Sequence, residues 1–274
     1  MSELDRIMAN TRQVLARRSE QLPAHMLLAQ CEARRSAGDE RSFLDALRRP
    51  GMSMIAEHKR SSPSAGEIRS DLALADVVRA YERGGAAALS ILTEESRFGG
   101  ALGDLAAARA ASSLPILRKD FIVDTYQVLE AYAGGADAIL LIVAALTTNE
   151  LGRLHLDATE LGLDVLVEVH DQLELGLAVE LGAPIIGINN RDLKTLDVDT
   201  GRALQMRASL PAETVAVAES GYSRPEQLEQ LAEVGVDAVL VGEALMRSPD
   251  IEAGLRRLLT GVGKRDRSGR PAGA

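Results

Sequence analysis

Residues 132–142, YAGGADAILLI, contain the pattern that decides the fold: a Gly followed closely by an uninterrupted apolar run. The pattern recurs in ERGGAAALSIL (82–92), ATELGLDVLVEV (158–169), AVELGAPIIGIN (178–189) and AEVGVDAVLVG (232–242). A Gly at such a position can end a helix, because Gly takes positive φ without steric cost. We therefore expect positive φ at Gly85, Gly135, Gly162, Gly182 and Gly235, with a strand after each.

Short apolar runs recur about every 20 to 35 residues, which is the length of one strand and helix unit. The predicted strands are 54–57, 87–92, 115–118, 138–143, 165–169, 185–188, 214–218 and 238–241. Strands without polar alternation are typical of a parallel sheet covered by helices on both faces or closed into a barrel. A doubly wound open sheet is the alternative, but no GxGxxG follows the first run. The sequence therefore predicts an α/β fold, a (β/α)₈ TIM barrel with extra N-terminal helices.

We expect a single domain with three parts. Residues 1–51 form an N-terminal helical extension packed on the barrel, with helices near 4–20 and 42–49. Residues 52–260 form the catalytic barrel. Residues 261–274, GVGKRDRSGRPAGA, have no apolar period and are predicted to be a flexible tail.

The composition limits the class of protein and its partners. The chain is 46% hydrophobic and 26% charged, with a formal net charge of −9, which disfavours binding to nucleic acid or to anionic membranes. No apolar stretch approaches the roughly 20 residues of a membrane span. The lone Cys31 offers no disulfide, and the amino end is not typical of a signal peptide. We therefore predict a cytoplasmic protein.

Polar residues follow most of the predicted strands, at the barrel face where active sites of this fold lie. Charged residues also follow strands simply because loops are solvated, but three carboxylates and two lysines at one level would converge and exchange protons. The residues at the strand ends are Glu57 with Lys59, Ser90, Lys119 with Asp120, Glu168 with His170, Asn189 with Arg191, and Glu219 with Ser220.

Glycines after the last two strands indicate an anion site. Gly221, and Gly242 with Glu243, can present backbone N–H groups to a phosphate, although tight turns also need glycines. The loop KRSSPSAGEI (59–68) adds hydroxyls, and Ser62 is its candidate phosphate contact.

These segments together resemble the indole-3-glycerol phosphate synthase family over nearly the whole chain. They are IAEHKRSSPSAGEIR (55–69), LPILRKDFIVDTYQVLEAYAGGADAILLI (114–142), LVEVHDQLEL (166–175), IGINNRDLKTL (186–196), VAESGYS (217–223) and VLVGEALMRSPD (239–250). The resemblance implies a lyase of tryptophan biosynthesis that converts 1-(2-carboxyphenylamino)-1-deoxyribulose 5-phosphate to indole-3-glycerol phosphate. It also implies no metal, no organic cofactor, and a small phosphorylated, anthranilate-derived substrate as the partner.

The resemblance assigns a role to each matching position. Lys119 is the general acid for ring closure, Lys59 contacts substrate anions and assists dehydration, Glu57 is its partner and base, and Glu168 is a base or an electrostatic support. Asn189 and Glu219 orient the intermediate. The substrate-pocket residues are Arg191 and Ser220, the phosphate contacts are Ser62, Gly221, Gly242 and the backbone of Glu243, and the apolar wall is Phe121 and Leu140.

Other readings remain open at this level. Phosphoribosylanthranilate isomerase, another phosphate-binding barrel, would use an Asp and a Cys, and Cys31 precedes the barrel. A non-catalytic paralogue would bind the ligand without turnover. His58 replaces a commonly apolar residue, and strand alternation points it away from the site, while His170 is an equally weak candidate. We expect a monomer or a weak homo-oligomer.

Overall fold

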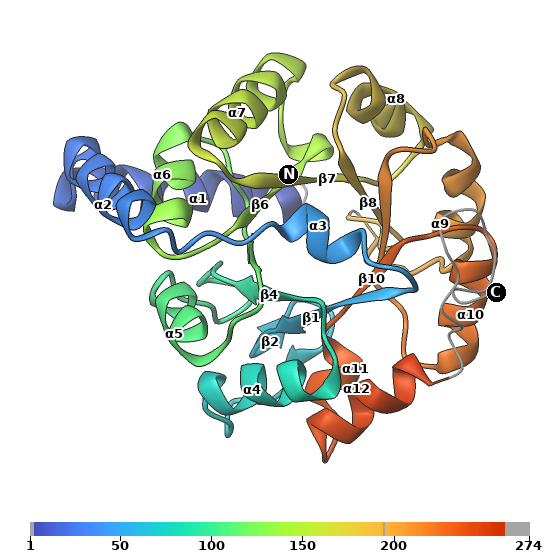
Figure 1. Cartoon of the computed structure of the whole chain (residues 1–274). Coiled ribbons are helices and arrows are strands. Elements are labelled where there is room, and N and C mark those ends of the chain that lie inside the picture. The colour runs from blue at the N-terminus through green and yellow to red at the C-terminus, as the bar shows by residue number, and fades with distance from the viewer. Residues whose placement is uncertain (1–2, 194, 261–274) are drawn as a thin grey trace.

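Eight parallel strands form a closed barrel in the computed structural model, which describes residues 3–193 and 195–260 (Figure 1). The first strand, β1, closes the barrel by pairing with β4 on one side and β10 on the other. Every strand begins and ends within one residue of its predicted run, so the predicted (β/α)₈ barrel is confirmed. The strands are β1 (Ser53–His58), β4 (Ala88–Leu92), β5 (Ile116–Lys119), β6 (Ala138–Ile142), β7 (Asp164–Val169), β8 (Ile185–Asn189), β9 (Val215–Glu219) and β10 (Ala238–Val241).

Helices surround the barrel in a ring (Figure 1). They are α4 (Leu74–Gly84), α5 (Gly103–Ala111), α6 (Thr125–Ala133), α7 (Thr148–Leu161), α8 (Gln172–Glu180), α9 (Gly201–Met206), α10 (Pro225–Glu233) and α12 (Ile251–Leu259). The five glycines expected to end helices all have positive φ, between 75° and 99°. None of the described helices is both long and apolar enough to cross a membrane.

Shorter elements lie in the loops. The loop after β1 folds into a hairpin of β2 (Ser61–Ser62) and β3 (Gly66–Glu67), and the four-residue helix α11 (Glu243–Met246) follows β10 directly. Two 3₁₀ turns, η1 (Val143–Ala145) and η2 (Arg207–Ser209), follow β6 and α9.

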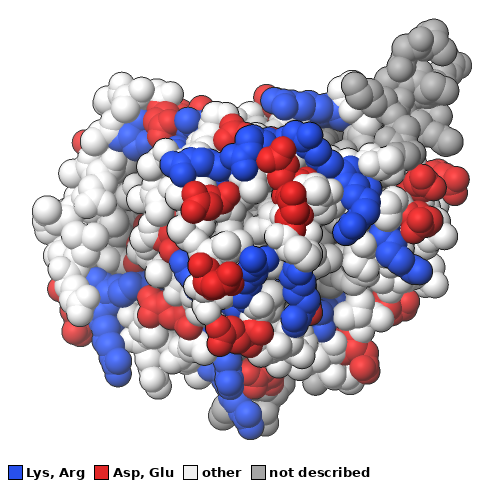
Figure 2. All heavy atoms as spheres, turned by 90° about the horizontal axis from the view of Figure 1, so that it is seen from below, with Lys and Arg blue, Asp and Glu red and all other residues white. Residues whose placement is uncertain are grey.

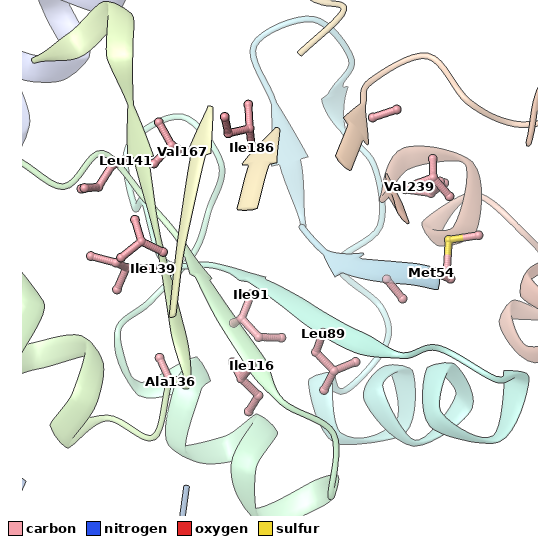
Figure 3. Close-up of a cluster of buried hydrophobic side chains, with 14 of the residues drawn as sticks. Met54, Leu89, Ile91, Ile116, Ala136, Ile139, Leu141, Val167, Ile186 and Val239 are labelled. Carbon is pink, nitrogen blue, oxygen red and sulfur yellow. The ribbon is translucent and has the colours of Figure 1, made fainter. Parts of the chain in front are cut away.

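Strand side chains alternate between two apolar cores. One core lies between the strands and the outer helices, where Figure 3 shows Met54, Leu89, Ile139 and Val167. The other fills the barrel interior. Apolar residues therefore occupy both faces of the strands, which explains why the runs show no polar alternation.

Three helices precede the barrel: α1 (Glu3–Gln21), α2 (Ala24–Ala37) and α3 (Phe43–Leu47). The short α3 lies across the barrel in Figure 1, and its Phe43 and Leu47 complete the interior core at the amino ends of the strands. The predicted extra helices are thus confirmed. The division at residue 51 stays a prediction, and the predicted tail, 261–274, lies outside the described residues.

Candidate active site

A cavity of about 450 Å³ opens at the carboxyl ends of the strands. Strands, the loops that follow them and the start of α1 all contribute to its wall. It brings together every residue that the sequence assigned to a site: Glu57, Lys59, Ser62, Lys119, Phe121, Leu140, Glu168, Asn189, Arg191, Glu219, Ser220, Gly221, Gly242 and Glu243.

Strand alternation places the charged side chains at the cavity floor. A residue two positions beyond an inward-facing residue also faces inward, one layer higher in the barrel. On four strands, an apolar residue of the interior layer is therefore followed two positions later by a charged residue at the cavity floor. The pairs are Ile55 and Glu57, Leu117 and Lys119, Leu166 and Glu168, and Val217 and Glu219.

Lys119 lies between two carboxylates. Its Nζ is 2.9 Å from Oε2 of Glu168 and 3.3 Å from Oε2 of Glu219. Burial alone would lower the pKa of Lys119, but Glu168, Glu219 and Glu57 outweigh it and raise that pKa above its ordinary value. Lys119 is therefore an ammonium group at neutral pH.

The two carboxylates beside Lys119 differ in charge. Burial alone would raise the pKa of Glu168, but Lys119 and the ring of His170 hold it well below its usual value. For Glu219 burial prevails, with the charge of Glu168 adding to it, and the pKa rises to about 8 despite Lys119. Glu168 is thus ionised near neutral pH and Glu219 is mostly protonated, so one site holds both an acceptor and a donor.

A second ion pair joins Lys59 to Glu57, with 2.9 Å between Nζ and Oε1. Gly242 leaves room for this carboxyl group, because a Cβ at that position would lie only 3.1 Å from Cβ and Cδ of Glu57. The cavity floor thus carries two ammonium groups and three carboxyl groups.

The turn after β9 has a constrained backbone. Ser220 has φ of 68° and Gly221 has φ of 91°. The Ser220 hydroxyl donates to Oδ1 of Asn189 at 2.9 Å, and the Asn190 side chain donates to the Ser220 carbonyl at 2.9 Å. Non-Gly residues rarely adopt such φ, and these bonds hold the strained turn with Gly221 at the cavity wall.

Across the cavity mouth, Ser62 and Glu243 complete the anion-binding set expected from the sequence. Glu243 begins α11, where the first backbone N–H groups of a helix lack partners within it. Its carboxylate accepts a hydrogen bond from Nε of Arg247 at 3.0 Å.

Apolar side chains form the remaining wall. Phe121 packs near Phe98 with 6.5 Å between ring centroids, and Leu140 and Ile142 of β6 lie in the same cavity. This wall suits an aromatic ring, because binding cavities for small molecules combine apolar walls with a few polar groups.

Residues 4–258 match the family model described as indole-3-glycerol phosphate synthase. The chain belongs to this family. A Nocardioides relative named indole-3-glycerol phosphate synthase is 48% identical over 262 residues, which cover 96% of this chain and 99% of the relative. A Mycobacterium avium relative of the same name is 50% identical over 216 residues, covering 78% of this chain and 79% of the relative.

Solved structures support the fold. A 3-hexulose-6-phosphate synthase from Salmonella typhimurium matches with a TM-score of 0.61 at 16% identity, covering 76% of this chain and 96% of that one. A tryptophan synthase alpha-subunit variant from Pyrococcus furiosus matches with a TM-score of 0.60 at 16% identity, covering 77% of this chain and 99% of that one. At these identities the similarity concerns the fold alone.

Part of the cavity wall comes from residues that the sequence did not indicate as site residues. Glu3, Leu4 and Ile7 of α1 line it, as do Phe98 and Arg247. The spacing of Leu4 and Ile7 on one helix face was a usable signal, but nothing local indicated that this face would cover the barrel mouth.

The two doubtful histidines differ in position. His58 does not line the cavity; it is buried, as strand alternation predicted, and its Nδ1 has no hydrogen-bond partner among the described residues. His170 is also outside the cavity lining, but its ring contacts Glu168. Within 3–193 and 195–260, no cluster of three or more His, Cys, Asp or Glu residues could hold a metal ion.

Proposed function

We propose that this cavity converts 1-(2-carboxyphenylamino)-1-deoxyribulose 5-phosphate to indole-3-glycerol phosphate, with loss of carbon dioxide and water. The observation that carries the proposal is the position of the Lys119 ammonium between Glu168 and Glu219 on the floor of the cavity. Family membership supports the reaction, and the residue roles that follow are those that the resemblance implies, with the contacts as support.

Ring closure needs an acid at the ribulose carbonyl. The ring carbon that bears the carboxylate attacks the carbonyl carbon, and Lys119 protonates the carbonyl oxygen as it gains charge. The bond to the carboxylate then breaks, carbon dioxide leaves, and its electron pair restores the aromatic ring. Glu168, which stays ionised, keeps Lys119 oriented and can receive a proton when one is released.

Dehydration completes the indole. Lys59 protonates the departing hydroxyl, which leaves as water, and Glu57 takes the proton lost from the adjacent methylene group. The pairing of Lys59 with Glu57 keeps this acid and base together. Asn189 and the protonated Glu219 orient the intermediate by hydrogen bonds.

The substrate has a phosphate at one end and an aromatic ring at the other, and the cavity has a polar side and an apolar side. Ser62, Gly221, Gly242 and the backbone N–H of Glu243 would bind the phosphate, with Arg191 and Ser220 beside it. Phe121 and Leu140 would hold the anthranilate ring. This division fixes which way round the substrate binds.

The alternative isomerase activity finds no support at this site. Cys31, the one Cys of the sequence, is buried on α2 with its thiol 3.6 Å from the Leu129 carbonyl, and it does not line the cavity. Purified wild-type protein with the anthranilate-derived substrate decides between an enzyme and a ligand-binding paralogue, through the fluorescence of the indole product.

The protein would act in the cytoplasm as a monomer or a weak homo-oligomer. The net charge of −9 supports this by disfavouring attachment to anionic membranes. Sedimentation over a range of protein concentrations tests the oligomeric state.

Replacing Lys119 with Ala tests the central role. Turnover should fall by at least about 100-fold, because the carbonyl oxygen loses its proton donor, while substrate affinity stays within about tenfold. Steady-state kinetics measure both values. The control is Arg79→Ala, which removes an exposed cation on α4 and should leave turnover unchanged. Near-normal turnover by the Lys119→Ala protein would refute the assignment.

A further inference from the structure

His170 lies behind the cavity floor, between two carboxylates. Its Nε2 is 3.3 Å from Oε1 of Glu168, and its Nδ1 is 3.0 Å from Oε2 of Glu174. The His170 side chain is 10% exposed and that of Glu168 only 2%. The ring therefore meets one oxygen of the Glu168 carboxylate, Oε1, while Lys119 contacts the other, Oε2.

The start of α8 fixes the position of this ring. Asp171 caps the helix by accepting the Glu174 N–H at 2.9 Å. The Glu174 carboxylate turns back to accept the His170 backbone N–H at 2.7 Å, through the same oxygen that contacts the ring. Both the backbone and the ring of His170 are thus held by one helical turn, an arrangement related to a capping box.

Charges alternate along this line of side chains from the cavity outward: Lys119, Glu168, His170 and Glu174. Burial alone would lower the pKa of His170, but the carboxylates of Glu168 on β7 and Glu174 on α8 raise it to about 10. The ring is therefore a cation at neutral pH: Nδ1 is hydrogen-bonded to Glu174, and Nε2 forms an ion pair with Glu168 at 3.3 Å that lies outside hydrogen-bond geometry.

We propose that His170 is a positioning residue for Glu168: its charged ring holds Oε1 so that Oε2 stays on Lys119. This inference rests on the proposed function, because it concerns the acid and base of that reaction. Without the ring, the buried carboxylate would keep Lys119 as its one close cationic partner and lose the contact that fixes its rotation. Lys119 would then be less well aligned with the carbonyl oxygen.

Two near-isosteric variants separate the contacts of the ring. In His170→Gln the amide nitrogen reaches about as far as Nε2 and can donate to Glu168, but the contact to Glu174 is lost. In His170→Asn the amide nitrogen reaches about as far as Nδ1 and can donate to Glu174, but not to Glu168. His170→Ala loses both contacts.

The kinetics of these variants test the proposal. His170→Ala and His170→Asn should lower kcat by about 10-fold to about 100-fold with KM within about threefold, because a misplacement of about 1 Å costs rates of this order. His170→Gln should recover most of the lost rate. In His170→Ala the acid limb of the pH dependence of kcat should move to higher pH, since Glu168 loses a neighbouring cation.

Other outcomes identify which idea fails. Melting temperatures that fall in all three variants while kcat and the acid limb stay at wild-type values would show a purely structural role and overturn the proposal. Equal losses in the Gln and Asn variants would overturn it too, and this comparison stands even if His170→Ala does not fold. Absence of indole-3-glycerol phosphate formation by the wild-type protein would instead overturn the proposed function.

Discussion

At the scale of single residues, an absent side chain is as important as those present. Gly187 of β8 lies opposite Glu168 in the sheet, and the Glu219 carboxyl group fills the space beside it. A Cβ at this position would overlap Oε1 of Glu219 and lie 3.2 Å from Cδ1 of Leu166. The place of Glu219 beside Lys119 therefore depends on Gly187. The glycine is needed here for the space that it leaves, since its backbone φ is not positive.

Gly187→Ala should displace Glu219 and lower kcat by about tenfold or more, with a smaller effect on KM, since a shift of about 1 Å is costly at a reacting centre. Steady-state kinetics would show this. The matched control is Gly176→Ala in α8, where an added Cβ meets nothing within 4 Å and helix propensity favours Ala by up to about 1 kcal/mol. Equal kcat values for the two variants would mean that Gly187 does not position the carboxyl group.

The sequence predicted the site residues on the strands because alternation is a local rule. Glu57, Lys119 and Glu168 each lie two residues beyond an apolar strand residue that faces the barrel interior, so one rule directs all three inward. The same rule correctly turned His58 away. It could not identify the contact of His170, because that contact depends on where the first turn of α8 lies beside β7.

At the scale of elements, the strands and the glycines that end helices were predictable, since burial on both faces and positive φ leave clear patterns. The N-terminal helices were predictable as a helical extension on the barrel, but not the place where each of them packs. A surface helix buries one face, and its sequence does not say which partner covers that face. For α2 the partner is α6 and the start of β6, reached by the buried side chain of Arg34.

Arg34 provides a test of how firmly the N-terminal helices belong to the barrel. Its guanidinium donates to the Tyr132 carbonyl at 2.7 Å and to Oδ1 of Asp137 at 2.7 Å. Arg34→Leu removes one donor from each of these buried acceptors, and although Asp137 stays paired with Arg109, breaking one arm of a buried ion-pair network costs roughly 3 kcal/mol. For a chain of this size the melting temperature should fall by about 6–12 °C.

Arg17→Leu makes the same substitution at an exposed position of α1, and thermal melts followed by circular dichroism should show almost no change for it. Similar melting temperatures for the Arg34→Leu and Arg17→Leu proteins would mean that α2 is held by its apolar face alone.

At the scale of the whole molecule, the charge distribution fits an enzyme that binds a small anion inside a cavity. On the face shown in Figure 2, basic and acidic side chains lie beside one another. The cations that matter for the proposed chemistry, Lys59 and Lys119, lie inside the barrel mouth. The sequence indicated this internal placement through the strand ends, but the cover provided by α1 arises only from the complete fold.

The same buried charges should give the whole molecule a characteristic dependence of stability on pH. Glu219 has a folded pKa of about 8, above its ordinary value, so the stability it contributes is present at low pH and is lost as pH rises through about 8. His170, with a pKa of about 10, acts in the same direction at higher pH. His58, lowered to about 4 mainly by burial, acts oppositely: its contribution is present above its ordinary pKa and is lost as pH falls through about 4.

Glu219→Gln should therefore flatten the loss of stability on the alkaline side, because the amide cannot ionise beside Glu168. Between about pH 6 and about pH 9 the wild-type melting temperature should fall further than that of the variant, by about 3 °C or more. The matched control is Glu229→Gln, the same chemical change at an exposed position of α10, which should keep the wild-type slope. The Glu219→Gln protein should be more stable than wild type at about pH 9 and yet turn over more slowly, since the carboxyl group that orients the intermediate costs stability when it ionises. A wild-type slope in the Glu219→Gln melts would mean that another group titrates there, and that Glu219 is ionised in the folded protein at neutral pH.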